Sequence, residues 1–189
     1  KGYGLRGLDA SHPGFSVTLS TNPREAVRVA TKKDVALLYW TAASWAAAIS
    51  LSKDNPALIG EIPQMEALID RALELDETFG DGAIHSFLIS YEPARQGASG
   101  DPTVRSLRHF ERAMELSHGA QAGPLVAFAE GVSVQKQDVK QFDELLNRAL
   151  AIDADVHPEY RLVNLIMQRR ARWLLSGIGR ASASAKQQN

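Results

Sequence analysis

Apolar residues recur with the spacing of one helical face in three similar stretches of the chain, residues 71–76, 112–117 and 148–153. In each stretch an alanine directly follows an arginine, and a large apolar residue precedes the alanine by three positions (Ile69 and Ala72, Phe110 and Ala113, Leu146 and Ala149). A small residue lets a neighbouring helix approach, and a large residue one turn away fills the groove beside it. The pattern predicts three equivalent helices, each packed against a partner helix, with the arginines directed toward solvent (Arg71, Arg112, Arg148).

The spacing of the three alanines indicates a repeat. They are 41 and 36 residues apart, which is close to the period of about 34 residues of tetratricopeptide repeats. The partner helices are expected at residues 34–52, 81–94 and 124–135. Asn55-Pro56 and Asp101-Pro102 each supply a capping side chain followed by proline, which is typical of a helix start. The sequence therefore predicts an all-α fold of tetratricopeptide-like helical hairpins, an α-solenoid.

The two ends of the chain follow other patterns. Residues 158–176 predict a final helix that caps the array, with several side chains at helical spacing (Leu162, Leu165, Ile166, Arg169, Trp173, Leu174). Prolines and turn residues divide residues 1–31 into short pieces that are expected to be helical turns. Residues 179–189 are polar and are predicted to be a disordered tail. We expect one helical repeat domain over residues 1–178.

Composition and charge narrow the possible partners. The 189-residue chain is 44% hydrophobic and 23% charged, as is ordinary for a folded, soluble protein. Its formal net charge of −1 supplies no field that would attract nucleic acid. Because the chain has no cysteine, it cannot form disulfides or Cys-based zinc sites. The apolar run at 35–51 is interrupted by polar residues, so we expect a buried helix there, not a membrane span.

Motifs for catalysis are missing from the sequence. It contains no HExxH, no phosphate-binding glycine loop and no nucleophile elbow, so we expect no catalytic residue, no cofactor and no metal site. His85 and Glu92 are seven residues apart, two turns along one helical face, and could meet a ligand together. The alternative is a hydrogen-bonded histidine beside the core and a solvated carboxylate. His109 and His118 are expected at the surface.

Aromatic residues point to a candidate ligand site. Trp40 and Trp45 are five positions apart, about 500° of helical rotation, so both cannot face one seam. One of them is expected to line a groove beside residues 82–92, although packing in the core would also explain both. The candidates are Tyr39, Trp40, Trp45, His85, Phe87, Tyr91 and Glu92.

The last helix supplies a second group of candidates. Arg169, Arg170 and Arg172 form a basic run that is expected either to bind an acidic partner or to lie on a solvated face. The partner-binding candidates in this helix are Arg169, Arg172 and Trp173.

Three segments carry a resemblance to a known family. Residues 38–52 (LYWTAASWAAAISLS), 82–92 (GAIHSFLISYE) and 164–175 (NLIMQRRARWLL) resemble, in the same order, signature segments of the TRAP transporter T-component family. The resemblance implies an exported bacterial lipoprotein in the periplasm, built from tetratricopeptide-like helices, that associates with the substrate-binding P-component. It also implies homotrimers with apolar cavities for a hydrophobic ligand. The lipid-bearing cysteine of the family is absent, so anchoring through an upstream segment is expected.

We expect a non-enzymatic accessory component of a TRAP-type import system that binds the substrate-binding protein and an apolar solute. The main alternative is a tetratricopeptide adaptor that grips a peptide in its concave groove. An enzyme that uses His85 and Glu92 as acid and base is the third hypothesis.

Overall fold

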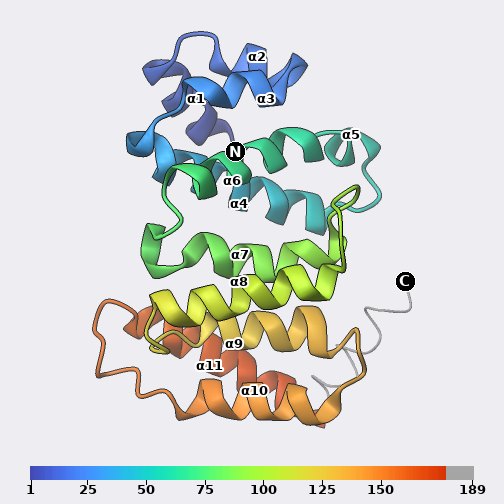
Figure 1. Ribbon diagram of the computed structural model, residues 1–189, viewed down its shortest axis with the longest axis vertical. Helices are drawn as coiled ribbons and strands as arrows, with labels where there is room; N and C mark the ends of the chain where they lie inside the picture. Colours follow the sequence, from blue (N-terminus) through green and yellow to red (C-terminus); the bar gives the residue numbers. More distant parts are fainter. Residues whose placement is uncertain (178–189) are drawn as a thin grey trace. The chain divides into compact units, whose positions relative to one another are not determined.

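The computed structural model describes residues 1–177 (Figure 1). These residues form helices and connecting turns, with no strand among them, which confirms the predicted all-α class. Contacts within the chain group it into two compact units, Lys1–Gly80 and a second that begins at Asp81. The predicted disordered tail at 179–189 lies outside the described residues. The tetratricopeptide arrangement and the single-domain boundary stay predictions.

The first unit is built on a hairpin of two long helices. In chain order its helices are α1 (Gly2–Ser11), α2 (Phe15–Thr21), α3 (Pro23–Ala26), α4 (Val35–Leu51), α5 (Pro56–Ile59) and α6 (Ile62–Leu75). Helices α4 and α6 pack against each other, and α1 packs on α4. The side chain of Asn55 accepts hydrogen bonds from the backbone N–H groups of Ala57 and Leu58, so the predicted cap is present and starts α5. The predicted helical pieces in residues 1–31 are confirmed.

Helix α4 is apolar on every side. Its Leu38, Ala42 and Trp45 are buried, whereas Trp40 and Leu51 are 65% and 87% exposed. The prediction of a buried helix therefore holds for one side only. By length and composition Lys32–Leu51 would also suffice to cross a membrane, a property that core helices of soluble proteins share.

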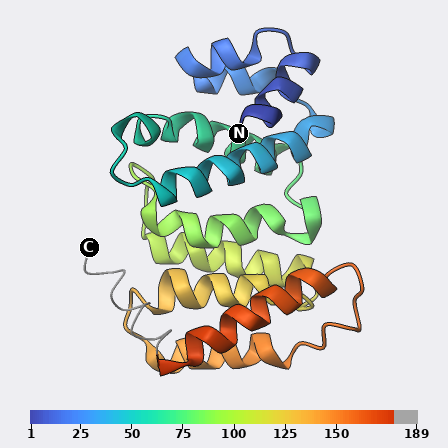
Figure 2. The ribbon, with the colours of Figure 1, turned by 180° about the vertical axis from the view of Figure 1, so that it is seen from behind.

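The second unit contains the other helices. They are α7 (Ala83–Tyr91), α8 (Pro102–Leu116), α9 (Gly123–Phe128), α10 (Val139–Ala151) and α11 (Arg161–Leu175). Helix α7 pairs with α8, and α11 packs against both α9 and α10 (red-orange helix in Figure 2). A π-helical turn, Ala129–Ser133, continues α9. Asp101 accepts a hydrogen bond from the backbone N–H of Thr103, as its position before Pro102 predicts.

The small residues of the repeat lie where the pattern predicts. Ala72, Ala113 and Ala149 are completely buried. The prediction of a solvent-directed arginine is correct for Arg148, which is exposed, but wrong for Arg71. The guanidinium of Arg71 instead donates a 3.0 Å hydrogen bond to the carbonyl of Ala30 within the first unit.

A close contact between the start of α7 and the backbone of α8 requires a glycine. Gly82 immediately precedes α7 with φ of 96°, in the left-handed region, and a Cβ at this position would lie 3.0 Å from the Cα of Ala113. Residues other than glycine are strained at this φ, and the backbone atom opposite cannot rotate away. A side chain at Gly82 would therefore push the start of α7 away from Ala113.

Replacing Gly82→Ala should destabilise the protein by more than the strain of a positive φ alone, which is roughly 1–2 kcal/mol. The matched control is Gly97→Ala, because Gly97 has φ of 72° and open space around its Cβ position. Urea unfolding followed by circular dichroism should show the larger loss for Gly82→Ala, by about 1–3 kcal/mol. Equal losses would contradict the close contact with Ala113.

Candidate functional site

Two histidines face each other across the α7–α8 hairpin. The Nδ1 atoms of His85 and His109 are 2.9 Å apart, and His85 is 5% exposed. A hydrogen bond between two ring nitrogens needs one N–H and one lone pair, so the two rings cannot both be protonated and keep it. Burial, followed by the electrostatic effect of His85, lowers the pKa of His109 to about 4. His118 is exposed as predicted, but the prediction of a surface His109 is wrong, because α8 turns this residue toward α7.

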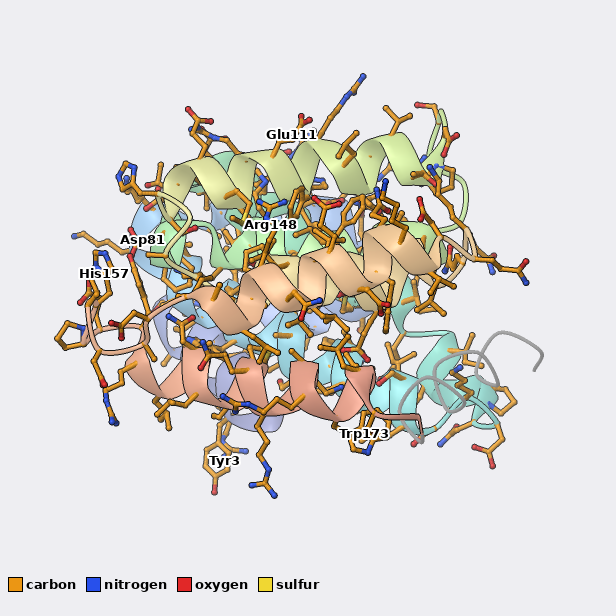
Figure 3. All side chains as sticks on the ribbon, turned by 90° about the horizontal axis from the view of Figure 1, so that it is seen from below. Tyr3, Asp81, Glu111, Arg148, His157 and Trp173 are labelled. Carbon is orange, nitrogen blue, oxygen red and sulfur yellow. The ribbon has the colours of Figure 1, made fainter. Side chains whose placement is uncertain are left out.

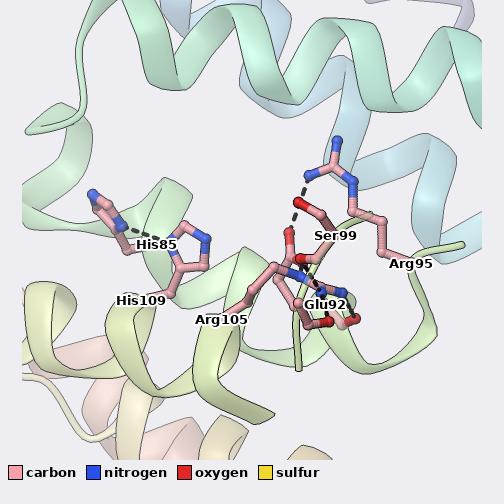
Figure 4. A network of polar contacts seen from close by, with 7 residues as sticks. His85, Glu92, Arg95, Ser99, Arg105 and His109 are labelled. Carbon is pink, nitrogen blue, oxygen red and sulfur yellow. Dashed lines mark hydrogen bonds and ion pairs between the residues drawn. The ribbon is translucent and has the colours of Figure 1, made fainter. Parts of the chain in front are cut away.

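Glu92 lies at the end of α7 and is only 3% exposed. Its carboxylate accepts hydrogen bonds from Arg95 at 3.0 Å and from Arg105 of α8 (Figure 4). Burial alone would raise the pKa of Glu92, but the hydrogen bonds from Arg105 and Arg95 hold it below its ordinary value. The expected solvated carboxylate is therefore wrong, because two arginines compensate its charge in a buried place.

Arg105 joins three parts of the second unit. Its guanidinium bonds the Glu92 side chain and donates to the carbonyls of Ser99 and Gly100, at 3.0 and 2.7 Å. This residue therefore holds the loop between α7 and α8 against the start of α8. Figure 4 shows the arginine network and the histidine pair as two neighbouring groups. His85 and Glu92, predicted to act together, are thus engaged with different partners.

The aromatic candidates of α7 form a half-buried stack. Phe87 and Tyr91 are one turn apart, with ring centroids 5.7 Å apart and an interplanar angle of 22°. The guanidinium of Arg95 lies 5.9 Å from the centroid of Tyr91, so the stack borders the arginine network.

The aromatic candidates of α4 face in two directions, as their spacing predicts. Trp45 is buried, and its indole N–H donates a 2.8 Å hydrogen bond to Glu61. Trp40 is exposed and meets Tyr39 in an edge-to-face arrangement, at a centroid distance of 4.9 Å. Tyr39 in turn packs against Phe79 at 5.3 Å, and burial raises its pKa. Trp45 is thus a core residue, whereas Trp40 presents its ring to solvent. The expected place of these residues beside 82–92 stays a prediction.

Most of the large apolar side chains of helix α11 face away from the core of the second unit. Of the side chains whose spacing predicted this helix, only Leu174 is buried. Polar Asn164 and Gln168 lie on the inner side instead. Asn164 accepts a hydrogen bond from the N–H of Ala122 and donates to the carbonyl of Ala120. Gln168 donates to backbone carbonyls at the end of α10. The candidates on the outer side are exposed (Arg169, Arg172, Trp173).

No group of three acidic, histidine or cysteine side chains within residues 1–177 is positioned to hold a metal ion. The buried titratable groups of α7 and α8 contact one another: His85 bonds His109 through Nδ1, and Glu92 pairs with Arg95 and Arg105. Their arrangement is that of a network that holds two helices and a loop in register.

A family model described as TRAP transporter T-component matches residues 1–180. The chain belongs to this family. T-components are accessory components of TRAP transporters and are not known as enzymes. This T-component is 26% identical over 176 residues to an uncharacterized protein of Treponema pallidum (strain Nichols), in an alignment that covers 91% of the chain and 54% of the relative. The chain thus spans about half the length of that relative.

Sequence reasoning overlooked several residues of these networks. Arg95 and Arg105 lie in a loop and on a helix face that carry no motif in this T-component, whereas His109 is predicted from the sequence but only as a surface residue. Asn164 and Gln168 had a usable signal, because they lie four residues apart and continue along the same face to Ala171.

Replacing Glu92→Gln should destabilise this T-component by roughly 3–5 kcal/mol, because the change leaves two partly buried arginines without their compensating charge. Urea unfolding measures the loss. The matched control is Glu111→Gln on the exposed side of α8, which should stay within about 0.5 kcal/mol of the original protein. A small loss for Glu92→Gln would mean that solvent reaches the network.

The T-component should lose stability as the pH falls from about 6.5 toward 4. The folded-state pKa of His109, about 4, lies below its ordinary value of 6.5, so the unfolded chain binds a proton that the folded chain does not. One such proton gives a slope of up to about 1.4 kcal/mol per pH unit. Urea unfolding at pH 7, 6 and 5 should show a flatter dependence for His109→Gln than for the exposed control His118→Gln. Identical slopes in the two variants would exclude this role of His109.

Proposed function

We propose that this T-component is a non-enzymatic accessory protein of a TRAP-type solute import system and that it binds the substrate-binding P-component of that system. The match of the family model over residues 1–180 carries the proposal. Large apolar side chains exposed on α4 and α11, among them Trp40 and Ile166, support it, because exposed apolar patches mark binding surfaces.

The proposal includes a place and an assembly. The protein works in the periplasm, held at the membrane by a lipid on a segment outside this chain, and it forms trimers. Its helical hairpins, with buried alanines at their contacts, are arranged as tetratricopeptide-like repeats. An apolar cavity receives a hydrophobic solute. The family resemblance of residues 38–52, 82–92 and 164–175 motivates each of these statements.

The polar networks agree with a role in binding and not in catalysis. Glu92 is neutralised by Arg95 and Arg105, and His85 is bonded to His109. A general base must be within reach of a substrate and basic enough to take its proton, whereas Glu92 is 3% exposed and its two arginines hold its pKa below the ordinary value. The alternative, a peptide-binding adaptor, differs from the proposed function in its partner. An adaptor would bind a peptide, whereas the proposed function requires binding to the P-component.

The T-component should form a complex with the P-component of the same transport system at tens of micromolar or below. Sedimentation velocity of the mixture measures this. The control is a substrate-binding protein from an unrelated importer, which should sediment independently. Absence of a complex with the P-component at these concentrations, together with binding to peptides on an array, would replace the proposal with the adaptor.

Native mass spectrometry tests the assembly and the solute together. We expect a trimer whose mass includes an apolar adduct that is lost after gentle organic extraction. A monomer without an adduct would contradict both parts.

A further inference from the structure

The outer face of α11 carries large apolar side chains with arginines among them. We define this face by six residues, all exposed (Leu162, Leu165, Ile166, Arg169, Arg172, Trp173). Leu162, Ile166 and Trp173 are 71%, 52% and 38% exposed. Figure 3 shows Trp173 on the side of α11 that faces away from α10. The guanidinium of Arg170 lies 4.4 Å from the Trp173 ring centroid, so the indole is held in place by a cation–π contact.

The inner face of the same helix does not need these apolar residues. Asn164 and Gln168 fix it to the backbone at Ala120, Ala122, Ala149 and Ile152, and Ala171 and Leu174 fill the remaining contact. A helix on the surface of a protein ordinarily turns its large apolar residues inward. Here the polar residues face inward and the large apolar ones face outward, so packing within the second unit does not explain the outer face.

The charges on this helix are of one sign. Helix α11 contains four arginines and no acidic residue. Arg161 pairs with Asp155, and Arg170 pairs with Glu130. Within residues 1–177 no ion pair is formed by Arg169 or Arg172. Arg169 lies in line with Leu162, Ile166 and Trp173, at successive helical turns. A partner that covers the apolar residues therefore covers this charge too and must supply a carboxylate to it.

We propose that the outer face of α11 is the docking surface for the P-component, and that the P-component meets it with an apolar surface containing a carboxylate opposite Arg169. This inference rests on the proposed function and adds the surface and the chemistry of the partner. The apolar residues supply the area that is buried on binding, and Arg169 and Arg172 select the partner by charge.

The same charges argue against two other occupants. A second copy docked through the same face around a two-fold axis would bring the arginines of both copies together, and like charges in an interface are unfavourable. The proposed trimer would instead join two different faces, and the sedimentation assay below decides whether α11 is one of them. A helix that lies on a membrane keeps its cations on the polar side of its apolar face. Arg169 lies within the apolar row instead, where it would enter the hydrocarbon boundary.

The test compares two variants of the outer face with two matched controls. Ile166→Asp and Arg169→Glu place an acidic group on α11, whereas the controls Val104→Asp and Arg148→Glu replace a β-branched apolar residue and an arginine at exposed positions of α8 and α10. Far-UV circular dichroism and urea unfolding verify that each variant is folded. Isothermal titration calorimetry with the P-component then measures the dissociation constant.

We expect Ile166→Asp and Arg169→Glu to weaken binding at least tenfold, and the two controls to bind as the original protein does. Arg169→Lys, which keeps the positive charge, should retain most of the affinity. If the original protein binds the P-component and the α11 variants bind equally well, the docking surface is wrong while the proposed function stands. If the original protein does not bind at all, both fail.

Two further measurements separate the other occupants. Sedimentation velocity of the protein alone would show whether the α11 variants dissociate an oligomer, and flotation with phosphatidylglycerol vesicles would show whether they release it from lipid. An effect of the variants in either assay, without an effect on P-component binding, would overturn the proposal in favour of self-association or of membrane contact.

Discussion

The contact between Gly82 and Ala113 sets the geometry of the α7–α8 hairpin, because a single added carbon at Gly82 would meet the backbone of α8. At this separation the rings of His85 and His109 come within hydrogen-bonding distance, and Arg105 reaches the carboxylate of Glu92. The first unit uses the same device, since the side chains of Thr41 and Leu37 on α4 occupy the space that a Cβ on Gly4 or Gly7 would need. Small residues thus determine where larger and polar groups meet.

The polar groups buried between these helices fix the register in which the helices pack. Apolar contacts tolerate a shift along a helix, whereas a hydrogen bond between two particular atoms does not. Glu92 joins the end of α7 to the start of α8 through Arg105, and Asn164 and Gln168 join α11 to the turns beside it. Each network links segments that are adjacent in the fold but distant in the chain, so each selects one register of packing. The donors and acceptors of these networks bond other parts of the protein and stabilise the fold.

Local patterns predicted the helices well, and tertiary partners explain what they did not predict. The alanine-and-arginine segments located α6, α8 and α10, because helical spacing and small contact residues are properties of a short stretch. The burial of Glu92 depends on Arg105, 13 residues away, and that of His109 on His85, 24 residues away. No window of one helix contains that information. The apolar pattern of α11 does not reveal its orientation, because its outer face is the more apolar, and only the turns that receive Asn164 and Gln168 show which side is inward.

On α11, stability and surface character depend on different residues, and this affects how the protein can evolve. In most helices one set of apolar residues provides both stability and surface character, so a change in recognition also risks unfolding. Here the side chains that anchor the helix and those that face outward are different residues. Substitutions at Leu162, Ile166 or Trp173 can accumulate without loosening the core. Duplicated copies of such a gene can therefore diverge in partner preference while they keep one scaffold.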